Sequence, residues 1–217
     1  MPNDISIRIR PADLRDVKQL ARLHYICSSV QPGAFMYRLG LRFLVEYYRV
    51  ILSNKTSIVL CADAAGDGIV GLVSVTLRPE KELEAMRKRR LRFLLAVLPA
   101  IIRRPALIEA VYLRNRSLSA KFLGEGFLSH SCPRIAYWGW SPDYPSYGKS
   151  MTLLTEIMRL VREIGENRLQ LEVDRINRKV EVTHRLLGAK VVREFTTSDG
   201  RERIIMEYEF HALGTQA

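Results

Sequence analysis

The chain has 217 residues, which is enough for one sizeable α/β core and short for two domains of typical size. Hydrophobic residues make up 47% and charged residues 26%, a composition that excludes wholesale disorder. The formal net charge of +11 favours a polyanionic partner, which includes nucleic acid, an acidic membrane surface and a phosphorylated ligand. We therefore expect one domain over residues 1–212, and the total charge alone does not select its partner.

Cysteine usage and the first residues bear on the cellular compartment. Cys27, Cys61 and Cys132 lie far apart, without the spacing of a metal or redox motif, and their odd number cannot be fully paired within the chain. The first residues lack the basic region and the apolar run of a secretory signal. These features predict a cytoplasmic protein that uses no metal.

The N-terminal part predicts a strand, two helices and a hairpin. Apolar and polar residues alternate over 5–10, which is the period of a half-buried strand. Apolar residues then recur at helical spacing after Asp13, a candidate N-cap, and again over 43–51. Two apolar runs, 57–62 and 69–75, flank a turn-forming segment and predict a hairpin.

The C-terminal part alternates strands and helices after a basic, helical insert over 79–133. Strand character returns over 134–140, a turn follows, and a helix with an apolar face runs from near 150 to a stop at Gly165. Residues 169–173, 191–192 and 204–210 predict strands, and 180–187 predicts a short helix. The order predicts an α/β fold of the α+β type, with a mixed central sheet of about seven strands flanked by helices.

The turn between Trp140 and the helix near Ser150 is a candidate anion site. The backbone N–H groups and the dipole at a helix N-terminus attract phosphate or pyrophosphate. Gly148 would let a ligand approach the backbone closely, because glycine has no Cβ. An ordinary turn between strand and helix is the alternative, since one glycine is weak evidence for a phosphate loop.

With this order of elements, the segment resembles the GNAT family of N-acetyltransferases. The coenzyme-A loop of that family follows the pattern hydrophobic-x-Pro-Glu/Asp-aromatic-Arg-Gly-x-Gly-x-Gly/Ala, and residues 140–150 read Trp-Ser-Pro-Asp-Tyr-Pro-Ser-Tyr-Gly-Lys-Ser. Four positions fall in register, namely Pro142, Asp143, Tyr144 and Gly148, whereas Pro145 replaces the usual Arg or Gln. The resemblance implies that acetyl-CoA, as co-substrate, contacts the loop residues Trp140, Ser141, Pro145, Ser146, Tyr147, Gly148, Lys149 and Ser150.

A second match lies downstream, where the family has Asn-x-x-Ala-x-x-x-Tyr-x-x-x-Gly-Phe. Asn177 and Gly188 match this pattern, and His184 stands in place of the Tyr. The resemblance implies that Asn177 contacts the coenzyme and that His184 protonates the leaving thiolate. Imidazole can donate a proton at neutral pH, so the replacement is chemically tolerable. A packing or hydrogen-bonding role for His184 is the alternative.

The resemblance implies direct attack of a primary amine on the thioester, with backbone N–H groups near 139–141 polarising the acyl carbonyl. The general base is not identified by the sequence. The first two helices usually shape the acceptor pocket, which makes Ser28 and Ser29 substrate-binding candidates, while His24 and Tyr25 are expected to pack. A small-molecule or sugar-linked amine is the expected acceptor. The alternatives are a protein N-terminus or lysine, or a non-enzymatic protein that binds nucleic acid or a membrane surface, although no specific nucleic-acid motif is evident.

The insert carries basic clusters on both sides of an apolar run over 93–102. This run is well short of the ~20 residues that a membrane span requires. Residues 87–104 could pack on the domain or on a second subunit in a homodimer. They could also lie on an anionic membrane at its inner face, or cover a phosphorylated acceptor such as a lipid-linked sugar. The sequence leaves these interpretations open.

Overall fold

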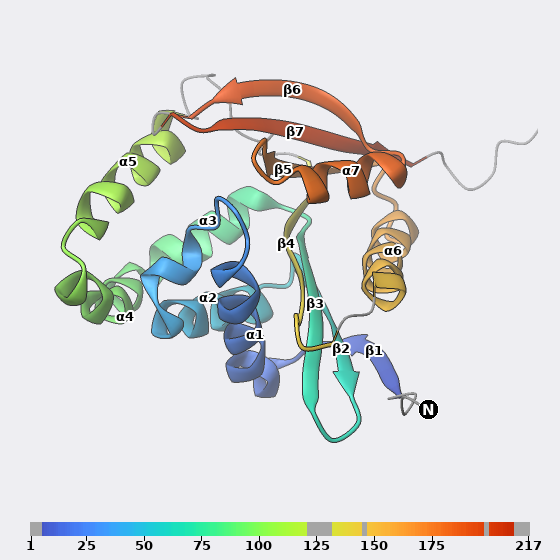
Figure 1. Cartoon of the computed structure of the whole chain (residues 1–217), viewed down its shortest axis with the longest axis horizontal. Coiled ribbons are helices and arrows are strands. Elements are labelled where there is room, and N and C mark those ends of the chain that lie inside the picture. Colours follow the sequence, from blue (N-terminus) through green and yellow to red (C-terminus); the bar gives the residue numbers. More distant parts are fainter. Residues whose placement is uncertain (1–5, 121–131, 145–146, 198–199, 211–217) are drawn as a thin grey trace, which may run out of the picture.

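The computed structural model describes residues 6–120, 132–144, 147–197 and 200–210. A seven-stranded mixed sheet with the order β1-β2-β3-β4-β5-β7-β6 forms its centre, which confirms the predicted fold class (Figure 1). The strands are β1 (Ile7–Pro11), β2 (Ser57–Ala64), β3 (Gly68–Thr76), β4 (Arg134–Trp140), β5 (Arg168–Asp174), β6 (Lys190–Thr196) and β7 (Glu202–Glu209).

The sheet consists of two antiparallel parts joined by one parallel pair. Strands β1 to β4 pair antiparallel, as do β5, β7 and β6, and only β4 and β5 run parallel. A parallel pair needs a crossover, and the long helix α6 (Tyr147–Glu163) provides it. Helices α1 (Val17–Ser29) and α2 (Leu41–Ser53) lie on the opposite side of the sheet from α6 (Figure 1). Helix α7 (Arg178–Leu186) connects β5 to β6.

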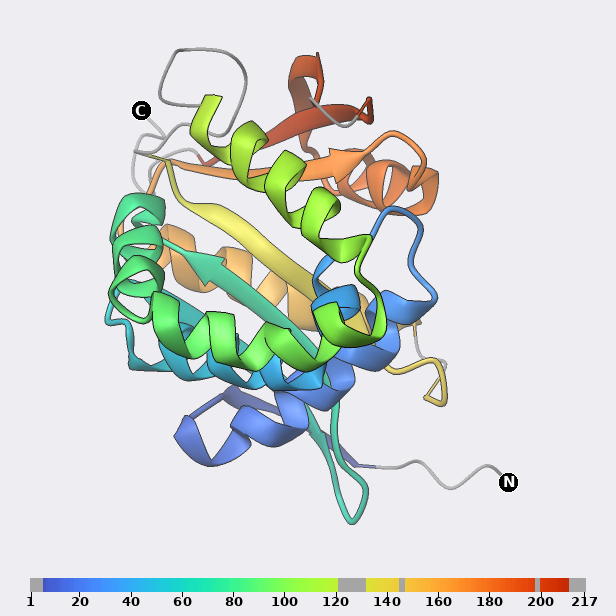
Figure 2. The same ribbon diagram turned by 90° about the vertical axis from the view of Figure 1, so that its left-hand side faces the viewer.

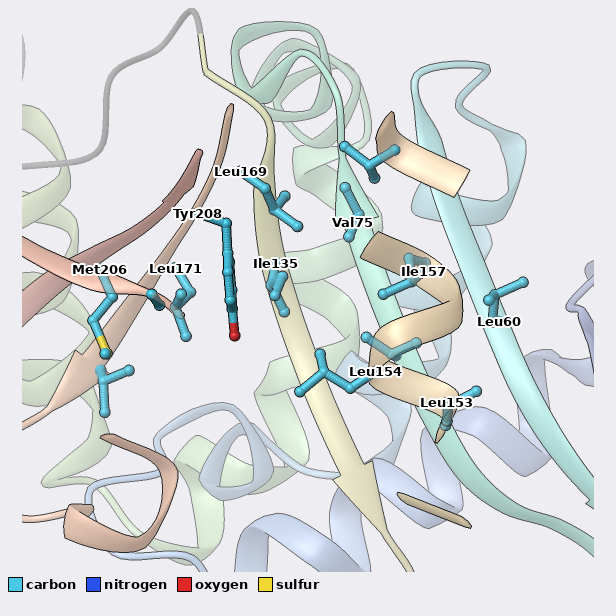
Figure 3. Close-up of a cluster of buried hydrophobic side chains, with 14 of the residues drawn as sticks. Leu60, Val75, Ile135, Leu153, Leu154, Ile157, Leu169, Leu171, Met206 and Tyr208 are labelled. Atoms are coloured by element: carbon cyan, nitrogen blue, oxygen red, sulfur yellow. The ribbon is translucent and has the colours of Figure 1, made fainter. Parts of the chain in front are cut away.

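The larger core lies between the sheet and α6. Apolar residues recur at helical spacing along α6, so one face of this helix is buried in the core. That face consists of Leu153, Leu154, Ile157 and Val161. Figure 3 shows this face against β4 and β3, with the Tyr208 ring beside Ile135 and Leu171. Burial of one apolar helix face against the sheet therefore holds the crossover in place.

The smaller core lies between the sheet and the helices α1 and α2. His24 is buried in it, with Nδ1 2.8 Å from the Tyr48 hydroxyl and the ring stacked on Tyr137 of β4 at 3.6 Å between centroids. Burial lowers the pKa of His24 to about 3, so the ring is neutral at neutral pH. The expected packing role of His24 is confirmed, whereas Tyr25 lies on the exposed side of α1.

The insert between β3 and β4 is helical, as predicted. Its described residues form α3 (Pro79–Lys88), α4 (Arg90–Arg103) and α5 (Leu107–Ala120). Short 3₁₀ turns lie elsewhere in the chain, at Leu14–Asp16 and Met36–Leu39. Phe93 of α4 packs against Phe43 of α2 with 5.2 Å between ring centroids. The insert is thereby attached to the α1–α2 side of the sheet.

Several element boundaries differ from the sequence prediction, among them those of α6 and β6. Helix α6 begins at Tyr147 rather than near Ser150, because the first turn of a helix makes few internal bonds and tolerates a glycine. Strand β6 extends over Lys190–Thr196, well beyond the predicted 191–192. It pairs only with β7 at the sheet edge and buries no residue, so its sequence shows no apolar alternation.

Replacement of Leu154 by alanine should lower the free energy of unfolding by about 2–5 kcal/mol, because it opens a cavity in the α6 core. Urea denaturation measures this loss. Leu95→Ala is the matched control, since Leu95 is exposed, and should change the free energy by no more than about 0.5 kcal/mol. Equal losses for the two variants would contradict the assignment of this core.

Candidate functional site

Strands β4 and β5 pair over only two positions and then separate. The parallel pairs are Arg134 with Gln170 and Ile135 with Leu171. On the other side of β4 the register against β3 shifts at the same point, which leaves Ala136 as an extra residue in a β-bulge. A bulge bends its strand, so β4 turns away from β5 directly after the last pair. The separation leaves one edge of β4 unpaired by a strand.

A cleft of about 170 Å³ occupies this opening. Its walls come from β4, β5, the start of β7, helix α7 and the segment between α1 and α2. The residues that line it include His24, Ser28, Gly33, Tyr137, Trp138, Glu172, Asp174, Asn177, His184, Arg201 and Arg203. A second, wider hollow adjoins it and shares Gly33, Asp174, Arg201 and Arg203 with the cleft. The cleft thus continues outward past these four residues.

The backbone of β4 presents alternate N–H groups to the cleft. The Ser141 N–H donates to the Val70 carbonyl at 2.7 Å, so it is committed to β3. Because N–H groups alternate along an antiparallel strand, that of Gly139 faces β3 as well, and those of Trp138 and Trp140 face the open edge. Of the expected donors near 139–141, those of Gly139 and Ser141 face β3, whereas that of Trp140 faces the open edge together with that of Trp138.

Internal contacts hold the turn after β4. The Trp140 indole N–H donates to the Tyr144 carbonyl at 2.5 Å, and the Tyr144 N–H donates to the Ser141 carbonyl at 3.2 Å. The Trp140 ring occupies the space beside Gly71, where a Cβ would lie 2.3 Å from it. Trp140 and the buried Ser141 thus shape the turn through their own contacts, and their predicted contact with the coenzyme stays a prediction.

The N-terminus of α6 is open around its glycine. Among the described residues, a Cβ added at Gly148 would meet no atom within 4 Å, so they leave the space beside this backbone open to a ligand. Helix α6 begins at Tyr147, and the N–H groups of a first helical turn lack acceptors within the helix. Lys149 is half-buried and Ser150 is buried. Of the other loop candidates, Pro145 and Ser146 lie outside the described residues, as does the Tyr147 side chain.

Helix α7 places Asn177 and His184 in the cleft wall. Both are buried, and the His184 Nδ1 lies 2.6 Å from the Tyr208 hydroxyl. Burial lowers the pKa of His184 to about 4, so the imidazole is neutral at neutral pH. The role of His184 in protonating the leaving thiolate stays a prediction, and the neutral ring offers one N–H donor. The edge of this ring contacts Trp138, with 5.7 Å between centroids.

Only one of the two serines expected at the acceptor side faces the cleft. Ser28 is buried in the wall, with its Oγ 3.2 Å from the Tyr137 hydroxyl. Ser29 is exposed, lies outside the cleft wall, and donates its hydroxyl to the Ile26 carbonyl at 2.7 Å. Successive side chains of a helix point in different directions, so the Ser29 candidate is wrong as a wall residue.

Two charged pairs in the cleft wall were missed by sequence reasoning. Glu172 of β5 forms a buried ion pair with Arg203 of β7. Asp174, two residues further on the same face of β5, pairs with Arg201 at 3.0 Å. In the sequence of β5, Glu172 and Asp174 alternate with the apolar Leu171 and Val173. This alternation is the one signal that could have indicated the two charged pairs.

A close contact joins the segment after α1 to the end of β5. The Arg201 guanidinium also donates to the Gly33 carbonyl at 3.1 Å. Gly33 has a positive φ of 74°, and a Cβ there would lie 2.7 Å from an Asp174 carboxylate oxygen. Glycine therefore allows the loop to approach this carboxylate. The contact narrows the outer end of the cleft.

Metal ligands, membrane-spanning helices and reactive thiols do not contribute to this site among the described residues. Within the described ranges, no three His, Cys, Asp or Glu side chains are arranged to hold a metal ion. The described helices also include none with the length and hydropathy of a membrane span. The three cysteines are free thiols, and burial raises the pKa of Cys27 to about 11, so this thiol beside Trp140 is protonated.

Comparison with known proteins gives matches in structure only. No family model and no curated protein matches the sequence. NAA60 of Arabidopsis thaliana, solved with a bisubstrate analogue, matches with a TM-score of 0.57 and 15% identity over 95% of this chain and 99% of its own. PaiA N-acetyltransferase of Thermoplasma acidophilum, solved with coenzyme A, gives 0.56 and 15% over 95% and 100%. A Desulfovibrio desulfuricans protein assigned to the GNAT family of acetyltransferases gives 0.58 and 12% over 94% and 99%. The chain therefore has the fold of the GNAT acetyltransferases.

Proposed function

We propose that the chain is an acetyl-CoA-dependent N-acetyltransferase that acts on a primary amine of a small-molecule or sugar-linked acceptor. Its main support is the separation of β4 from β5 after Ile135 and Leu171, which opens a cleft through the centre of the sheet. The fold likeness adds weight, because NAA60 was also solved with acetyl-CoA and PaiA with coenzyme A.

The residues around the cleft fit a coenzyme. The free space beside Gly148 at the start of α6 suits a pyrophosphate, which the first-turn N–H groups would hold. The buried indole Nε1 of Trp138 has no hydrogen-bond acceptor among the described residues, so a ligand could supply one. Asn177 lines the same wall. When bound, acetyl-CoA supplies the acetyl group as an activated thioester.

Two backbone N–H groups are suited to polarise the acyl carbonyl. Those of Trp138 and Trp140 face the open edge of β4, where no strand accepts from them. Donors that are fixed in advance by a strand lose no conformational freedom when negative charge develops on the carbonyl oxygen. In our proposal they bind that oxygen while the amine attacks the carbonyl carbon.

Glu172 is the candidate group that takes up the proton of the acceptor amine. It is the first residue of β5 beyond the last pair with β4, and it lines the cleft. Its ion pair with Arg203 favours the ionised carboxylate. An ionised carboxylate binds an ammonium group and accepts its proton as the nitrogen becomes nucleophilic. Asp174, which is paired with Arg201, places a second carboxylate nearer the cleft opening.

His184 is the candidate donor to the leaving sulfur. If the Tyr208 hydroxyl donates to Nδ1, the single imidazole proton resides on Nε2. Burial raises the pKa of Tyr208, which keeps its hydroxyl protonated for this role. The neutral Nε2–H would stabilise the thiolate by a hydrogen bond rather than transfer a proton outright.

The narrow outer end of the cleft favours a small acceptor over a protein. Arg201 connects Gly33 and Asp174 across this end, which leaves less room for a folded protein surface than for a small amine. A thiol-release screen with acetyl-CoA over amino sugars, polyamines and peptides separates the two classes. Turnover with peptides alone would favour the protein-acetyltransferase alternative.

Calorimetry should show binding of acetyl-CoA in the micromolar range, and Gly148→Trp should weaken it by about tenfold or more, because the indole would fill the phosphate space. No atom of the described residues lies near the added Cβ, so the variant should keep its melting temperature. Thr155→Trp, at an exposed position further along α6, is the control and should bind normally. Unchanged affinity of the Gly148 variant would contradict binding of the coenzyme at the N-terminus of α6.

Glu172→Gln should lower kcat by about 100-fold, because the amide cannot accept the amine proton, and should shift the rising limb of the pH–rate profile to higher pH. Binding of acetyl-CoA should persist in calorimetry. Glu194→Gln is the control, since Glu194 is exposed in the outer hollow, and should change kcat by less than about threefold. Equal rates and unchanged profiles for both variants would remove Glu172 from catalysis.

His184→Phe should slow turnover by about 10- to 100-fold, because a hydrogen bond to a charged group contributes about 1.5–3 kcal/mol. His184→Gln retains an N–H donor and should recover most of the rate. Since the pKa of His184 is about 4, its titration should leave no inflection in the wild-type pH–rate profile near neutral pH. An inflection that disappears in the glutamine variant would show instead that a protonated imidazole acts.

A further inference from the structure

Helix α4 presents large aliphatic side chains to the outside. Leucine and isoleucine residues with exposed fractions from 48% to 70% form what we name the apolar stripe, consisting of Leu91, Leu94, Leu95, Leu98 and Ile102. At 3.6 residues per turn these five positions fall within an arc of about 100° on one face of the helix. Ile108 and Tyr112 of α5 are exposed as well. Scattered surface leucines are ordinary, whereas a continuous stripe indicates a binding surface.

The orientation of α4 is fixed by its other face. Val97 is buried and Phe93 packs into the α1–α2 core, on the side of the helix opposite to the stripe. Helix α4 cannot turn the stripe inward without exposing these two residues. Figure 2 shows α4, in green, in front of the sheet together with the lighter green α5 above it. The stripe is therefore an outer surface of the folded chain.

The surroundings of the stripe are strongly basic. Between residues 85 and 108 the sequence has seven basic residues and no acidic one. Arg90 on one flank of the stripe and Arg92 and Arg103 on the other are exposed. An apolar face bordered by arginines on both flanks is the arrangement of helices that lie in the interface of an anionic membrane.

We propose that α4 docks in the plane of an anionic lipid surface, with the apolar stripe among the acyl chains and the arginines at the headgroups. A second copy of the chain would bring two strongly basic surfaces together, which charge repulsion opposes. A nucleic acid would engage the arginines and leave the stripe exposed to water. At 14 residues, the helix is about 21 Å long and too short to cross a bilayer. This surface is separate from the cleft and does not depend on acetyl transfer.

Vesicle co-sedimentation of the full chain tests this proposal. The chain should sediment with phosphatidylcholine vesicles that contain phosphatidylglycerol, much less with pure phosphatidylcholine, and less at raised ionic strength. The double substitution L94D/L95D should weaken partitioning by about tenfold or more, because it places charge in the stripe. R90Q/R92Q should weaken it by about 25-fold on anionic vesicles, at about fivefold for each charge removed.

Leu186→Asp is the matched control, because Leu186 is 78% exposed on α7, away from the insert. It should leave partitioning within about twofold of the wild type. All these changes lie at exposed positions, and melting temperatures would report any loss of fold. Equal sedimentation of the wild type and L94D/L95D would overturn the proposal. So would a wild-type dimer, measured by light scattering, that the stripe substitutions dissociate.

Discussion

The site depends on a single extra residue in β4. Ala136 shifts the register against β3 at the point where pairing with β5 ends. If β4 and β5 stayed paired, the sheet would use the N–H groups of Trp138 and Trp140. No opening would then lie beside the polar residues of β5. The bulge instead leaves two donors and two carboxylates around one opening. The two cores on either side of the sheet keep this opening from collapsing, because each is anchored by its own helices.

Charge within the cleft is retained at a cost in stability. Glu172 and Arg203 are both nearly inaccessible, and the desolvation of such a pair commonly exceeds the attraction between its members. Apolar residues of similar size would pack there without that penalty. The attraction within these pairs therefore does not by itself account for the stability of the fold. The Tyr208 hydroxyl and the His184 imidazole likewise form a buried polar contact next to an otherwise apolar core.

Much of the fold could be predicted from the sequence, because the apolar periodicity of 5–10, 57–75 and 169–173 is determined by burial on one or two faces. Less of the site could be predicted from the sequence. The pattern around Trp140 to Ser150 indicated the correct turn, but the direction of the Ser141 N–H depends on the register with β3. The position of His184 was correctly placed near the cleft, whereas its protonation state depends on burial by other segments. Glu172 and Asp174 resemble solvent-facing positions of a half-buried strand until both faces are known to be covered.

Because Trp140 contacts Gly71, the residue type at position 71 of β3 depends on the residue type at position 140 of β4. The indole ring lies where any side chain at position 71 would begin, and the same indole holds the turn through Tyr144. A larger residue at 71 would displace the ring, and with it the entry to the helix that follows. The two positions should therefore vary together among related sequences, with a bulky residue at one matched by a small one at the other. Engineering of the turn would need to treat them as one unit.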